Sequence, residues 1–351
     1  HKVYTKHSSF KGGLFIMKKL FVSMLLLLGI GATMLTGCGN TSNRVVIYTA
    51  AEEERIEYLQ KEMNAKFPQY EIVFQSIGTG ALVSKLQAEG KSTECDIFYD
   101  LEATNAEIIL NGNSDLFYDL SEYDFSIYDS SVTEYTKNHH KYAVNGKTVG
   151  TIVVNKKVLQ QNGCDVPATY DDLLKPEYKG LITMPSPKSS GTGYAFYNGL
   201  VSSMGESAAL SYFGSLDANI KEYTTSGSAP IKAVNKGEVA IGVGLLWQCV
   251  DYANKNSDLE VVFLNNEASY NLFTMGIISG KEKKESVKNV FDYLYNELNK
   301  VQCEKFNPDK IYVNQGKAEI ANYPTGFSEI VMHGVFDFKY KQDLLDKWSW
   351  S

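Results

Sequence analysis

Hydrophobic residues in this chain alternate between short continuous runs and stripes with helical spacing. The apolar run at Val45–Tyr48 suits a buried strand. The next apolar residues recur every three or four positions, as on one face of a helix: Ile56, Leu59, Met63 and Phe67. This alternation continues along the chain. We therefore predict an α/β fold, with parallel strands and helices on both faces of the sheet.

The same pattern places the remaining elements. We expect strands at 72–74, 97–99, 148–154, 181–184, 239–243, 261–264 and 275–278. Helices are expected around 82–86, 103–110, 194–204, 231–234 and 287–301. The segment 113–147 is polar without a clear period, and we interpret it as a crossing between two lobes. A length of 351 residues fits two lobes, predicted as 38–145 with about 262–300, and about 146–261 with 301–351.

The first 37 residues differ from the rest of the chain. A basic start at Met17 leads into an apolar run over 20–28, which ends at the tetrapeptide LTGC, residues 35–38. This order defines a secretory signal, predicted here as residues 17–37. The apolar run is too short for a membrane-spanning helix, which needs about 20 apolar residues. An uncleaved N-terminal anchor is the alternative. Residues 1–16 precede a complete signal, and we interpret them as a non-translated or artefactual extension.

Charge limits the partners that the chain can have. The whole sequence carries a formal charge of −7, but five of its 34 basic residues and none of its 41 acidic residues lie before residue 38. The rest therefore carries −12, which is unsuited to binding nucleic acid. Cysteines give no metal pattern either, because Cys95, Cys164, Cys249 and Cys303 are far apart in sequence. We expect no nucleic-acid partner, no metal and no cofactor.

Three loops at expected strand ends combine hydroxyl side chains with glycines: 76–80, 189–193 and 224–228. In open α/β sheets, ligands bind beyond the carboxyl ends of strands, and the helix starts that follow favour anions. Simple helix capping is the alternative for each loop, but three such loops favour a shared anion site. The candidate ligand residues are Gly78, Thr79, Gly80, Ser189, Ser190, Gly191, Thr192, Ser226, Gly227 and Ser228.

Three more residues are candidates for the ligand site. Asp100 follows an expected strand and could meet an ammonium group, or could simply be an acid at a helix start. Tyr48 and Trp247 stand near strand ends, where aromatic rings more often pack but can also contact a ligand. The sequence contains neither a nucleophile elbow nor a P-loop, so we expect no enzymatic activity.

Taken together, the sequence resembles extracellular solute-binding lipoproteins of bacterial ABC transporters. The closest branch contains binders of ferric iron, 2-aminoethylphosphonate and thiamine. The resemblance rests on LTGC (35–38), SIGTG (76–80), GTIVVNK (150–156), LITMPSPKSSGTG (181–193) and YTTSGSAP (223–230). It implies a type II periplasmic-binding fold that closes around its ligand and is read by a membrane permease. It also implies a monomer, lipid-anchored through Cys38 on the extracellular face of the cell membrane.

The resemblance also bears on the ligand. Ferric binders of this branch place adjacent tyrosines after the strand that here ends at Gly244, but this chain has Leu245, Leu246 and Trp247. Leucines cannot supply the phenolate oxygens that ferric iron requires. The retained hydroxyl loops favour a phosphonate or phosphate ester, such as 2-aminoethylphosphonate, held by neutral donors. The alternatives are a ferric iron or iron-chelate binder, an exported enzyme on the same fold, and an adhesin with a vestigial cleft.

Overall fold

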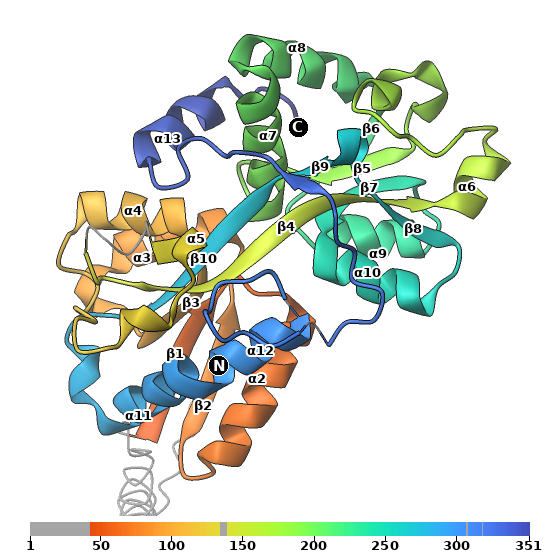
Figure 1. Cartoon of the computed structure of the whole chain (residues 1–351). Helices are drawn as coiled ribbons and strands as arrows, with labels where there is room; N and C mark the ends of the chain where they lie inside the picture. Colours follow the sequence, from red (N-terminus) through yellow and green to blue (C-terminus); the bar gives the residue numbers. More distant parts are fainter. Residues whose placement is uncertain (1–42, 134–138, 307, 318) are drawn as a thin grey trace, which may run out of the picture. The chain divides into compact units, whose positions relative to one another are not determined.

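The computed structural model describes residues 43–133, 139–306, 308–317 and 319–351 (Figure 1). The predicted extension, the signal peptide and the lipidation site Cys38 lie outside the described residues. Among the helices of the described ranges, none combines the length and the apolar character that a membrane crossing requires.

The first lobe is built on parallel strands that alternate with helices. Its elements are β1 (Arg44–Thr49), α2 (Glu53–Lys66), β2 (Glu71–Ser76), α3 (Thr79–Glu89), β3 (Ile97–Glu102), α4 (Ala103–Gly112), α11 (Glu285–Tyr293) and α12 (Asn299–Phe306). Strand β1 pairs in parallel with β2 and β3, as the sequence pattern predicts. The expected long final helix is continuous, but a π-helical turn at Leu294–Leu298 joins α11 to α12.

The second lobe repeats the alternation with a different order. Its elements are α6 (Lys156–Gln161), β5 (Ile182–Pro185), α7 (Gly191–Met204), α8 (Glu206–Leu216), β6 (Ile220–Thr224), α9 (Ala229–Asn235), β7 (Ile241–Leu245), α10 (Leu246–Lys255), β8 (Leu259–Val262) and α13 (Phe338–Lys347). Strand β5 pairs in parallel with β6 and β7. Helices α6, α8, α10 and α13 and strand β6 were not expected from the sequence pattern.

Two long strands join the lobes. Strands β4 (Ala143–Asn155) and β10 (Tyr270–Ile277) pair with each other in antiparallel fashion. Strand β10 also pairs with β3, while the second half of β4 pairs with β7 and β8, so one sheet extends through both lobes (Figure 1). The predicted parallel pairing is confirmed for β1, β2 and β3, whereas the two strands that join the lobes pair in antiparallel fashion. A strand that leaves one lobe and a strand that returns run in opposite directions, which makes the central pairing antiparallel.

Separate hydrophobic cores confirm the predicted α/β architecture with two lobes. One core contains Val45 and Ile47 of β1, and another contains Ile182 and Met184 of β5. The C-terminal part of the chain contributes to both. Cys303, Ile311 and Tyr312 pack in the core of the first lobe, whereas Leu344 and Trp348 pack in that of the second. Residues 301–351 do not pack as one block, and the residue boundaries given above for the lobes stay a prediction.

A buried arginine joins the first strands of the first lobe to its last helix. Arg55 on α2 is 1% exposed and donates to both carboxylate oxygens of Asp100, at 2.8 and 3.0 Å. It also donates to Glu52 at 3.1 Å and to the side-chain oxygen of Gln302 on α12 at 3.2 Å. Asp100 has a positive φ of 61° and accepts a further bond from Asn145. Asp100 therefore forms part of the buried hydrogen-bond network of the first lobe.

We predict that Arg55→Met lowers the free energy of unfolding by about 3–5 kcal/mol, because it leaves the Asp100 carboxylate buried without its partner. The other arginine is a matched control. Arg44 lies 3.6 Å from Glu71 and 3.8 Å from Glu94 at the surface, so Arg44→Met should cost less than about 1 kcal/mol. Urea unfolding of both variants measures the difference, and equal losses would contradict the assignment.

Candidate functional site

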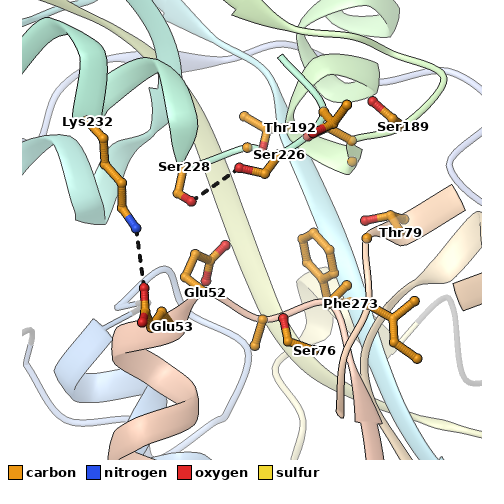
Figure 2. A pocket seen from close by; sticks show the side chains of 18 residues that line it. Glu52, Glu53, Ser76, Thr79, Ser189, Thr192, Ser226, Ser228, Lys232 and Phe273 are labelled. Carbon is orange, nitrogen blue, oxygen red and sulfur yellow. Dashed lines mark hydrogen bonds and ion pairs between the residues drawn. The ribbon is translucent and has the colours of Figure 1, made fainter. Parts of the chain in front are cut away.

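A cleft of about 260 Å³ lies where the lobes face each other (Figure 2). All three predicted loops contribute to its lining. The predicted residues around it are Gly78, Thr79, Ser189, Ser190, Gly191, Thr192, Ser226, Gly227 and Ser228. Residues from loops far apart in sequence thus meet at one place, because the strands that precede them end at the interface between the lobes.

On the second-lobe side, the loops 189–193 and 224–228 are in close contact. Ser190 is the N-cap of α7, and its hydroxyl accepts a hydrogen bond from the Gly193 N–H at 3.5 Å. A β-carbon on Gly227 would overlap the Thr192 hydroxyl and lie 3.3 Å from the Ser190 hydroxyl. Glycine at 227 therefore permits the contact, which places the Thr192 and Ser226 hydroxyls on one wall of the cleft (Figure 2).

The first-lobe side contributes the loop before α3. Ser76 and Thr79 line the cleft opposite the serine-rich wall (Figure 2). Gly80 lies just beyond, on a neighbouring cavity of about 210 Å³. A β-carbon on Gly80 would stand 2.9 Å from the backbone oxygen of Lys188, which belongs to the second lobe. The two lobes are thus in backbone contact beside the cleft.

Charged residues that the sequence analysis did not single out also line the cleft. Lys232 on α9 forms an ion pair with Glu53 on α2 at 3.5 Å, across the gap between the lobes (Figure 2). Among the described lining residues, Lys232 is the one cation. Glu52 lies beside Glu53, and burial raises its pKa while Arg55 acts to lower it. Lys232 gave no signal in the sequence, because a lysine in a short helix is usually a solvated surface residue.

An aromatic ring forms the floor of the cleft. Phe273 on β10 is 8% exposed, and its ring stands between the serine-rich loops and Thr79 (Figure 2). The neighbouring Asn271 donates to the backbone oxygen of Gly191 at 3.2 Å, which holds the start of α7 against the crossing strand. The sequence pattern missed Phe273 because the strand was expected to start only at Met275.

Besides Gly80, three more predicted ligand residues do not line the cleft. Tyr48 is fully buried in β1 and its hydroxyl donates to Glu89 and Glu94 at 3.3 and 3.4 Å. Asp100 is bound by Arg55, as described above. Trp247 is 2% exposed and packs edge-on against another aromatic ring. We correct the expected positions of all three, because standing at a strand end does not decide which way a side chain points.

The described residues contain no group of three or more His, Cys, Asp and Glu side chains arranged to hold a metal ion. The four described cysteines, Cys95, Cys164, Cys249 and Cys303, are buried and free. Burial raises the pKa of Cys303 to about 12 and raises that of Cys95 and Cys249 as well. A thiol with a raised pKa is a poor nucleophile and a poor metal ligand at neutral pH.

Comparison with known proteins extends these observations. An uncharacterized protein of Haemophilus influenzae is 25% identical over 284 residues, which cover 78% of this chain and 79% of that protein. The structure of AfuA from Actinobacillus pleuropneumoniae with fructose-6-phosphate bound superposes with a TM-score of 0.76 at 22% identity, covering 87% of this chain and 97% of that one. The periplasmic binding protein P5PA gives a TM-score of 0.75 at 22% identity, covering 87% and 98%.

The structural similarities confirm the expected type II periplasmic-binding fold. The family described as bacterial extracellular solute-binding protein matches residues 113–321, more than half of the chain. This confirms the resemblance noted in the sequence. The chain therefore belongs to the bacterial extracellular solute-binding proteins.

Proposed function

We propose that this protein captures a small anionic solute, a phosphonate or phosphate ester such as 2-aminoethylphosphonate, and presents it to an ABC permease. The observation that carries the proposal is the convergence of three hydroxyl- and glycine-rich loops on one cleft that also holds Lys232. Hydroxyls and backbone N–H groups can donate to several oxyanion oxygens at once, and a lysine supplies a point charge.

The protein acts, in this proposal, as a monomer anchored by lipid on Cys38 at the extracellular face of the cell membrane. Solute binding between the lobes favours the closed form, because only that form brings donors of both lobes to the solute. Closure is the signal that the permease reads. We propose neither catalysis nor a cofactor. In this proposal, the hydroxyls, backbone N–H groups and Lys232 that line the cleft serve to bind the solute.

The bound fructose-6-phosphate of the AfuA structure supports a phosphate ester as the solute class, since AfuA shares this fold along nearly its whole length. A ferric iron binder is the second candidate that the sequence left open. Against it, tyrosine is absent from the described residues that line the cleft. The sequence resemblance also implies adjacent tyrosines in ferric binders where this chain has Leu245, Leu246 and Trp247. An exported enzyme would need a nucleophile beside a base, whereas the Ser226 hydroxyl lies beside that of Ser228 and the Ser190 hydroxyl caps α7.

A melting-temperature screen tests the solute class. We expect 2-aminoethylphosphonate or a sugar phosphate such as fructose 6-phosphate to raise the melting temperature, whereas ferric citrate, thiamine and amino acids do not. A solute at 100 times its Kd adds about 2.7 kcal/mol of stability. Ser190→Ala with Ser226→Ala should abolish this gain, and Ser215→Ala on the surface of α8 should leave it unchanged. Stabilisation by ferric citrate alone would overturn the proposal.

Substitutions of Lys232 and of Glu53 should change the solute affinity in opposite directions. Lys232→Met should weaken binding of the stabilising anion roughly tenfold or more, because a charge-assisted contact is lost. Glu53→Gln should strengthen it, because Lys232 no longer has a competing carboxylate at 3.5 Å. Isothermal titration calorimetry measures both, with Lys221→Met as a control outside the cleft. The assignment fails if both substitutions change affinity in the same direction.

The backbone contact beside the cleft predicts a glycine requirement. Gly80→Ala places a β-carbon 2.9 Å from the Lys188 oxygen and should hinder closure, weakening solute affinity several-fold. Gly214→Ala on α8 is the matched control, since its β-carbon would lie at an ordinary 3.7 Å from the Trp350 ring, outside the cleft. We expect little change in the melting temperature of either ligand-free variant. Equal affinity of the two variants would contradict the closure argument.

A further inference from the structure

A buried ion pair lies in the second cavity between the lobes, beside the proposed solute cleft. Lys341 on α13 is bonded to the carboxylate of Glu102 at the end of β3, and the side chains are 5% and 0% exposed. The Lys341 ammonium also donates to the side-chain oxygen of Asn105 at 2.9 Å and stands 4.3 Å from the ring centre of Tyr194. Neither Lys341 nor its pairing had any signal in the sequence pattern.

The two charges belong to different lobes. Helix α13 is held in the second lobe, where Leu344 and Trp348 join the core and Tyr197 on α7 donates to the Leu344 backbone oxygen at 3.1 Å. Glu102 and Asn105 lie where β3 passes into α4 in the first lobe. The cavity of about 210 Å³ around the pair takes its walls from α3 and α4 on one side and α13 on the other.

The surroundings of the pair make its charges depend on each other. One oxygen of Glu102, Oε1, is buried without a hydrogen-bond partner in the part of the chain that the structure describes. Burial lowers the pKa of Lys341, and Glu102 acts to raise it. In the closed arrangement, the carboxylate therefore relies on Lys341 for its neutralisation. If the lobes separate, water enters the cavity and can solvate each charge on its own.

We propose that Lys341 and Glu102 form a latch between the lobes, an ion pair made in the closed form and broken in the open form. The pair sets the apparent affinity for the solute without contacting it. For a solute that binds only the closed form, the apparent Kd equals the intrinsic Kd of the closed form divided by the fraction of protein that is closed. Both are positioning residues. This inference rests on the proposed closure of the lobes, but it does not depend on which solute binds.

The latch predicts a specific pattern in a double-mutant cycle. Lys341→Met leaves a carboxylate buried and unpaired in the closed form, and Glu102→Leu leaves an ammonium in the same situation. Each single variant should therefore favour the open form and weaken fructose 6-phosphate binding by roughly tenfold or more. The double variant removes both charges and should return to within about threefold of the wild type.

Small-angle X-ray scattering of the ligand-free proteins measures the radius of gyration, which a loss of stability alone would not change while the protein stays folded. We expect a larger radius of gyration for both single variants at temperatures where each is fully folded, and the wild-type value for the double variant. Lys339→Met is the matched control, because Lys339 is 78% exposed on the same helix and pairs only loosely with Asp343, at 3.7 Å. It should change neither scattering nor affinity.

The outcomes separate the latch from the proposed solute. Single variants that scatter like the wild type, or a double variant as open as the single ones, would overturn the latch. If Lys341→Met does not fold, Glu102→Gln tests the same point, since it preserves the shape of the side chain and removes one charge. If fructose 6-phosphate fails to bind the wild type, the solute class is challenged, while the scattering of the ligand-free variants still decides the latch.

Discussion

The antiparallel pairing of β4 with β10 is the constraint on which the rest of the structure depends. These strands carry one sheet through both lobes, from β3 on one side to β7 on the other. Phe273 on β10 consequently lies at the floor of the cleft, and Asn271 holds the start of α7. The loops of both lobes converge because the strands before them end at this junction.

The interface between the lobes contains two ion pairs that differ in their exposure to water. In the cleft, Lys232 and Glu53 are exposed enough for water to screen them, so the anionic solute that we propose would displace Glu53 from the lysine at little cost. In the neighbouring cavity, Lys341 and Glu102 are almost fully buried and depend on each other. Loosely paired charges suit recognition of a solute, while a buried pair suits the control of closure.

Much of the fold followed from periodicity, since β1, α2, β2, α3, β3 and α4 all lie where apolar runs and helical stripes predict them. The three loops were identifiable because hydroxyls and glycines repeat at strand ends. Phe273, Lys232 and Lys341 were not, because an isolated aromatic or lysine has no local signature. Tyr48, Asp100 and Trp247 satisfied the local pattern, yet Tyr48 is hydrogen-bonded to Glu89 and Asp100 to the buried Arg55, and Trp247 is itself buried.

The sequence by itself determined the alternation of strands and helices, the acidic body and the hydroxyl- and glycine-rich composition of the loops, because each depends on residues near one another in the chain. Only the tertiary structure decided the mixed direction of the sheet, which loops share a cleft, and that Lys341 pairs with Glu102. Those features arise from contacts between residues far apart in sequence, and strand pairing and burial select them rather than local preference.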